Sequence, residues 1–177
     1  MHLIRSKSIL PLSTLLSAAT HIYAQNQTHL IVPALLTSPL NTTSIQCINL
    51  THPFTTSSTP GTLGTQALTL ATTNTTYTVL PPRFDGGLHN APAAQLVHFL
   101  SGLVHLTLPQ DPEGQELWIV GGKGGLVFAA DTVGQGHKTR YPGDEVTVAV
   151  VAPFEGGKVP EYSVVKEGVC EGLQTFL

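Results

Sequence analysis

A regular succession of short apolar segments in the second half of the chain constrains the fold more than any other sequence feature. The segments are residues 95–101, 103–108, 115–120, 126–130, 145–153 and 162–166. Glycine- and proline-containing turns separate them, for example at residues 121–125 and 141–144. Short strands at intervals of about 8–12 residues with such turns are typical of a β-sandwich or β-barrel. The sequence therefore predicts an all-β fold.

The first half differs in composition, because no charged residue occurs between Ser8 and Pro82. Residues 25–82 contain 16 Thr and 4 Ser, and such a stretch favours strands and loops over helices. We predict a strand at 44–50, a loop at 55–64, and a hairpin of strands 66–71 and 75–80. Residues 25–82 then extend a barrel core at 83–177, and 25–177 form one folding unit.

Residues 1–24 have the pattern of a secretory signal peptide. Arg5 and Lys7 precede a short apolar run, and Ala24 ends a plausible cleavage site. The apolar run is shorter than the about 20 residues that a membrane-spanning helix needs, so we expect no span after cleavage. The destination is extracellular or, alternatively, vacuolar. The competing interpretation is an N-terminal helix packed on the fold.

Glycosylation sequons and cysteines also fit the secretory pathway. N-glycosylation sequons begin at Asn26, Asn41, Asn49 and Asn74. The two cysteines of the chain are Cys47 and Cys170, an even number that suits an oxidising compartment. We predict a disulfide between them; the alternative is two separate buried thiols.

The charge of the chain excludes one class of function. Lys and Arg total 8, Asp and Glu total 11, and the formal net charge is −3. A nucleic-acid-binding protein needs a basic surface to neutralise phosphates, and this chain has no such cluster of Lys and Arg. We therefore expect a small-molecule partner and no nucleic acid.

Residues 89–141 resemble the cupin family. In the first cupin motif, His89 takes the first His position, Ala91 the second, Gln95 the Glu position and Gly102 the final Gly. The string His-Asn-Ala-Pro that begins at His89 is similar to one branch of small single-domain cupins.

The second cupin motif is matched in part. Gly125 opens it, Asp131 stands at the Pro position, and His137 follows one residue later than the pattern has its His. The resemblance implies a double-stranded β-helix, or jelly-roll barrel, with a pocket at its mouth.

The resemblance also assigns candidate site residues. A typical cupin site holds a metal with three His and one Glu, and here His89, His137 and Gln95 occupy matching positions. We expect these three as catalytic residues, or as ligands of a weakly bound divalent metal. Asp131 either orients His137 or supplies a missing carboxylate. His98 and His105 have the opposite strand parity and are expected on the outer face.

The function that the resemblance implies is a step in the secondary metabolism of filamentous fungi. A small secretory-pathway cupin of this kind assists oxygenation, isomerisation, decarboxylation or cyclisation of a small organic metabolite. The alternative is a non-catalytic glycoprotein that binds a small molecule or a sugar. Pairing into a homodimer is open in either case.

Overall fold

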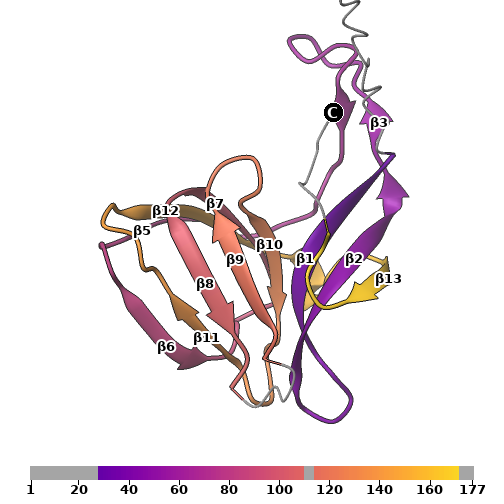
Figure 1. Ribbon diagram of the computed structural model, residues 1–177. Coiled ribbons are helices and arrows are strands. Elements are labelled where there is room, and N and C mark those ends of the chain that lie inside the picture. Colours follow the sequence, from indigo (N-terminus) through magenta and orange to yellow (C-terminus); the bar gives the residue numbers. More distant parts are fainter. Residues whose placement is uncertain (1–27, 110–113, 172–177) are drawn as a thin grey trace, which may run out of the picture.

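The computed structural model describes residues 28–109 and 114–171. Over these residues the chain forms strands and one short 3₁₀ turn, Glu155–Gly157, so the predicted all-β class is confirmed (Figure 1). None of the described helical segments is long and apolar enough to cross a membrane. The expected signal peptide, Asn26 and most of the C-terminal end lie outside the described residues.

A seven-stranded sheet forms one layer, in the order β13-β2-β1-β10-β7-β12-β5. Its strands are β1 (His29–Thr37), β2 (Thr43–Pro53), β5 (Thr76–Leu80), β7 (Gln95–Ser101), β10 (Leu126–Ala130), β12 (Thr147–Pro153) and β13 (Tyr162–Glu167). β1 and β10 are parallel, and the other neighbouring pairs are antiparallel.

A four-stranded antiparallel sheet forms the second layer, in the order β6-β11-β8-β9. Its strands are β6 (Asp85–His89), β8 (Leu103–Thr107), β9 (Glu116–Val120) and β11 (His137–Arg140). Figure 1 shows these strands in front of β5, β12 and β7. The fold is thus a β-sandwich of the jelly-roll type.

Two cores hold the layers together. The first lies between the sheets, where Val97 and Phe99 of β7 pack with Val104 and Leu106 of β8. The second lies on the other face of the seven-stranded sheet. There the ring of Phe128 meets that of Phe154 edge to face, with centroids 4.9 Å apart. β10 has side chains in both cores, which explains why its sequence is apolar on both faces.

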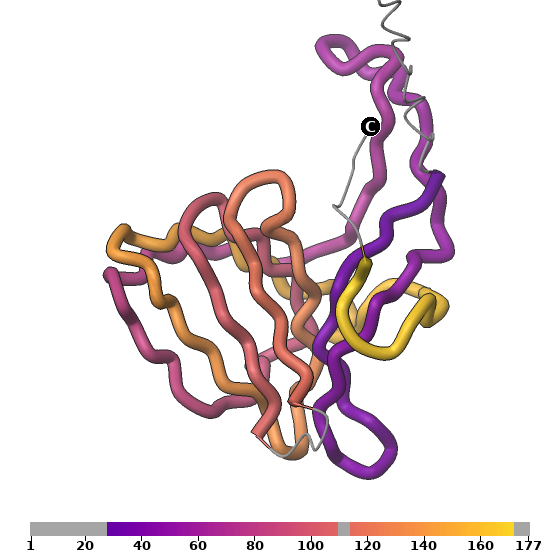
Figure 2. Tube along the Cα trace, in the orientation of Figure 1, coloured from indigo at the N-terminus to yellow at the C-terminus, as the bar shows by residue number. Residues whose placement is uncertain are grey.

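The predicted hairpin of residues 66–71 and 75–80 is wrong. β5 pairs with β12, and β4 (Gln66–Ala67) pairs with β3 (Thr55–Thr56). The pairing with β12 places Thr78 and Leu80 in the wall of the space between the sheets, and this contact, distant in the sequence, takes the place of the local hairpin. β3, β4 and the loop between them form an arm that stands away from the sandwich (Figure 2).

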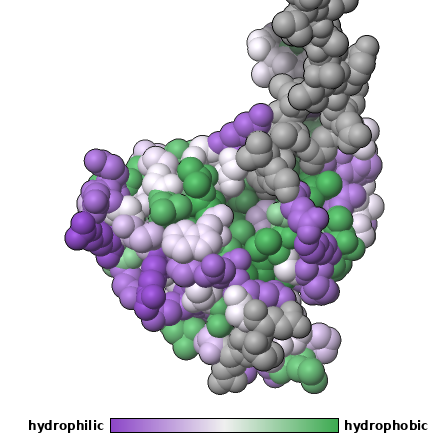
Figure 3. All heavy atoms as spheres, in the orientation of Figure 1, coloured by the Kyte–Doolittle hydropathy of each residue, from purple (hydrophilic) through white to green (hydrophobic). Residues whose placement is uncertain are grey.

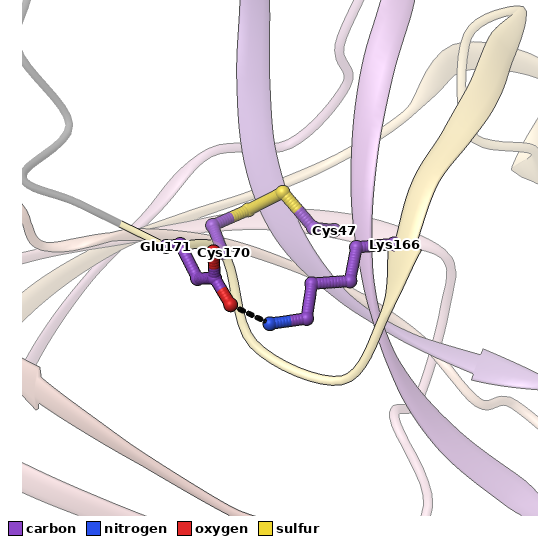
Figure 4. The surroundings of a disulfide bond; sticks show 4 residues. All are labelled: Cys47, Lys166, Cys170 and Glu171. Atoms are coloured by element: carbon purple, nitrogen blue, oxygen red, sulfur yellow. Dashed lines mark hydrogen bonds and ion pairs between the residues drawn. A yellow bond between two sulfur atoms is a disulfide. The ribbon is translucent and has the colours of Figure 1, made fainter.

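The predicted disulfide is confirmed. Cys47 of β2 is bonded to Cys170, with an S–S distance of 2.04 Å and 4.8 Å between the Cα atoms (Figure 4). Lys166 of β13 forms an ion pair with Glu171 beside it. The disulfide therefore holds the chain after β13 against β2, to which β13 already pairs.

The outer surface has no simple apolar face in the view of Figure 3, where hydrophobic and hydrophilic side chains are mixed. Exposed apolar side chains on the four-stranded sheet include Leu88, Trp118 and Val120. Charged side chains of Asp85 and Arg140 lie on the same sheet and form an ion pair. Homodimer formation stays a prediction.

Candidate functional site

Two histidines meet where β6 ends and β11 begins. His89 and His137 are cross-strand partners, and their ring centroids are 4.6 Å apart. His137 is only 4% exposed, whereas His89 is exposed to solvent. Nδ1 of His89 lies 3.2 Å from the backbone oxygen of Gly87 and can donate a hydrogen bond to it. The structure thus brings the two predicted histidines side by side, one inside and one at the surface.

A buried carboxylate holds His137. Oδ2 of Asp131 is 2.7 Å from Nδ1 of His137, and Asp131 is 0% exposed. Thr43 of β2 donates a longer hydrogen bond, 3.4 Å, to the same oxygen. A proton on Nδ1 that is donated to a carboxylate leaves Nε2 with a free lone pair. The geometry matches the predicted orienting role for Asp131 more closely than a role as a metal ligand.

The loop that carries Asp131 to His137 depends on two glycines. Gly134 and Gly136 have φ angles of 93° and 70°. A Cβ at Gly134 would lie 2.3 Å from the backbone oxygen of Asn41, and one at Gly136 would lie 2.4 Å from that of His89. Only glycine combines this conformation with such close approach. These contacts set the loop against both the β1–β2 turn and β6.

A cavity of about 130 Å³ opens beside this pair, between the two sheets. Its polar lining residues are Thr78, His89, Gln95, His137, Thr139 and Tyr141. The remainder are apolar: Leu35, Leu80, Val97, Phe99, Leu106, Val127, Ala129, Ala149 and Val151. The cavity therefore has a largely apolar wall, with imidazole, amide, hydroxyl and phenol groups at a few positions.

Gln95 lines the cavity, as its strand parity predicts. It begins β7, pairs with Ala129, and is 8% exposed. Its side-chain amide is part of the cavity wall, so it can donate or accept a hydrogen bond with a molecule in the cavity.

Tyr141 is a site residue that the sequence analysis missed. It follows β11, and alternation along this strand turns His137, Thr139 and Tyr141 toward the same cavity. Burial raises the pKa of Tyr141 to about 12, so its phenol stays protonated at neutral pH. The period-2 spacing from His137 could have identified Tyr141, had residues 137–141 been recognised as a strand.

Neither His98 nor His105 lines the cavity. Nε2 of His98 is 2.9 Å from the backbone oxygen of Gly122. Nε2 of His105 is 2.7 Å from Oε2 of Glu116, and this hydrogen bond holds the pKa of the Glu116 carboxyl below its ordinary value. The His105 ring also stacks on Trp118, with centroids 3.9 Å apart. Both histidines thus have partners elsewhere.

The donor set fits a tightly bound metal poorly. Asp131 does not line the cavity: its Oδ2 accepts hydrogen bonds from His137 and Thr43, and its Oδ1 is buried without a partner among the described residues. The described groups that could bind a metal in the cavity are therefore the neutral donors His89, His137 and Gln95. A divalent ion there would have no anionic protein ligand to balance its charge. Within the described residues, no three side chains of His, Cys, Asp or Glu are grouped as a metal site.

No protein-family model matches the chain, and no curated protein is significantly similar to it.

Proposed function

We propose that this protein is a small cupin-like enzyme of the secretory pathway that moves protons on a small organic metabolite. The observation that carries the proposal is the 2.7 Å hydrogen bond between His137, in the cavity wall, and the buried Asp131 carboxylate. An imidazole with this partner is a general base whose protonated form the carboxylate stabilises.

The polar groups around His137 have parts in this chemistry. Nε2 of His137 removes a proton from the substrate, and Asp131 stabilises the resulting imidazolium. The amide of Gln95 can donate a hydrogen bond to negative charge that develops on the substrate. The exposed ring of His89 can exchange protons between the site and water. Of the expected reactions, isomerisation and cyclisation depend most directly on such proton transfer.

Support for the secretory pathway and for a cupin comes from separate features. A disulfide is compatible with an oxidising compartment, and the signal-like N-terminus and the sequons agree with it. The jelly-roll type of sandwich is the fold that the motif resemblance in residues 89–141 implies. Fungal origin and secondary metabolism rest on that resemblance alone.

A second candidate is a non-catalytic protein that binds a small molecule. The mostly apolar wall of the cavity favours it, because such a wall is typical of small-molecule binding sites. The same wall offers few partners for the many hydroxyl groups of a sugar.

A base-promoted ring opening separates the two candidates. When a base removes the C3 proton of 1,2-benzisoxazole, the C–H electron pair completes the nitrile and the N–O bond breaks. The product, 2-cyanophenolate, is followed by its absorbance.

We expect the wild-type protein to accelerate this reaction, and His137→Asn and Asp131→Asn to lower the rate on the order of a hundredfold. His105→Asn, on the outer face, is the matched control and should keep the wild-type rate. A wild-type rate in His137→Asn would overturn the proposal.

A further inference from the structure

Over the residues that the structure describes, the cavity lining contains neither Lys, Arg, Asp nor Glu. The carboxylate of Asp131 does not line the cavity and is hydrogen-bonded to His137 through Oδ2. An ionised group placed among Leu35, Val97 and Val127 would lose its hydration without gaining an ionic partner. The free-energy cost of such a transfer is large. The lining therefore selects against carboxylates, phosphates and ammonium groups.

The size of the cavity sets a second limit. An apolar protein cavity of about 150 Å³ holds a benzene molecule. The volume here is about 130 Å³, so one six-membered ring fills it, and a substituent on the ring extends toward the opening. A nucleotide or a disaccharide could not be enclosed within this space.

The polar groups fix how such a ring is oriented. Gln95 begins β7 opposite Ala129 of β10, and Asp131, which holds His137, directly follows the end of β10. Gln95 and His137 therefore lie at the same end of the cavity. Tyr141 lies four residues beyond His137, about 13 Å away along an extended strand. The space between them is bordered mainly by apolar side chains such as Phe99 and Ala149.

From the charge and volume of the cavity and the Gln95 amide in its wall, we infer that the cavity takes an uncharged, ring-sized molecule with one polar group. A carbonyl or hydroxyl of that molecule lies at the end formed by Gln95 and His137, and its ring contacts the apolar wall. This inference rests on the proposed function, since it names the substrate class of the same site.

Three probes of similar size test the charge and the polar group separately. Benzamide is uncharged, benzoate is its anionic isostere, and toluene lacks the polar group. Binding is measured by isothermal titration calorimetry at neutral pH. We expect benzamide to bind at least tenfold more tightly than benzoate. Benzoate binding as tight as benzamide binding would overturn the inference.

Variants locate the binding in this cavity. Gln95→Leu should weaken benzamide binding about three- to tenfold, the loss of one hydrogen bond, and leave toluene binding unchanged. Ala149→Leu, which fills the cavity, should weaken both. If thermal unfolding shows that the Ala149→Leu variant is not folded, the Ala129→Leu variant is used in its place to fill the cavity. The control is Val150→Leu, since Val150 neighbours Ala149 on β12 and does not line the cavity. Unchanged benzamide binding in Gln95→Leu would overturn the inference.

The outcome is distinguishable from a failure of the proposed function. Selective benzamide binding without acceleration of benzisoxazole opening would retain the ligand class and refute the proton transfer. Acceleration that depends on His137, combined with equal binding of benzamide and benzoate, would retain the chemistry and refute the ligand class.

Discussion

Tyr141 has a phenol in apolar surroundings at one end of the cavity. Its ring contacts those of Phe84 and Phe99, with centroids 5.9 Å and 6.2 Å away. Removal of water around the hydroxyl disfavours the phenolate, and for this reason the pKa of Tyr141 is raised to about 12. The side chain therefore keeps its proton at neutral pH.

This raised pKa predicts how stability depends on alkaline pH. In the unfolded chain Tyr141 ionises near its ordinary pKa of about 10, while the folded protein keeps the proton until about pH 12. Because the folded state binds more protons in this window, its free energy of unfolding falls as the pH rises from about 10 to about 12. The contribution of Tyr141 to this fall is on the order of 2 kcal/mol.

Chemical denaturation at pH 9 and at pH 12 measures how far the free energy of unfolding falls between the two pH values, in the wild type and in Tyr141→Phe. We expect the variant to lose less stability than the wild type between the two pH values. Tyr162 is an exposed tyrosine, so Tyr162→Phe is the matched control and should behave as the wild type does. An equal fall in Tyr141→Phe would show that the phenol is not shielded from water.

At the scale of elements, the disulfide stabilises an edge of the seven-stranded sheet. β13 is an edge strand of that sheet, all six of its residues are exposed, and among the described strands it pairs only with β2. Cys47 lies within β2, and Cys170 follows β13 by three residues. An exposed edge strand buries little apolar surface, so the covalent bond contributes much of what keeps it in place.

Removal of this bond should lower the melting temperature. Its loss in Cys47→Ser costs about 3 kcal/mol, within the range typical of disulfides, which corresponds to about 6–12 °C in a domain of this size. Differential scanning calorimetry measures the change. The double variant Cys47→Ser/Cys170→Ser should melt at the same temperature as the single one, since both lack the same bond. A single variant that melts with the wild type would refute the stabilising role.

The strands that the sequence predicted are those with a local pattern. Residues 95–101 and 126–130 were predicted as strands and form β7 and β10 with the same bounds. β6 contains two adjacent glycines and β11 follows Gly136, so neither has a strand-like composition. Their pairing with each other, and of β11 with β8, comes from contacts distant in the sequence. Such contacts cannot be read from a single segment.

The candidate site could likewise be predicted from the sequence only in part. His89, Gln95 and His137 were identified by resemblance to the cupin motifs, and the structure gathers them around one cavity. Tyr141 and Thr78 were missed because their places depend on how β11 and β5 pair with other strands. The sequence left two roles for Asp131, orienting His137 or supplying a carboxylate to a metal. The direction of a side chain in a loop before a tight turn depends on the fold, so the sequence alone could not decide between them.

At the scale of the whole molecule, the sequons differ in where the fold places them. Asn41 lies in the turn between β1 and β2, and Asn74 lies between the arm and β5; both are exposed and have positive φ angles of 58° and 21°. Asn49 lies inside β2 and pairs with both β1 and β13. Its side-chain oxygen is buried and has no hydrogen-bond partner among the described residues. A glycan on Asn49 would require this buried side chain to leave its place on the sheet face.

We therefore expect glycans on Asn41 and Asn74 and none on Asn49 in the folded protein from a eukaryotic secretory host. Glycopeptide mapping measures the occupancy of each sequon, and sequencing of the N-terminus in the same sample tests cleavage after Ala24. Asn41→Gln and Asn74→Gln should each remove one glycan and lower the melting temperature only slightly, because both side chains are on the surface and the cost is that of glutamine at a positive φ angle. Asn49→Gln should leave the glycan mass unchanged and destabilise the protein, because a larger amide must fit within β2. Full occupancy at Asn49, or an unmodified protein that retains Met1, would contradict the placement of this chain in the secretory pathway with the fold described here.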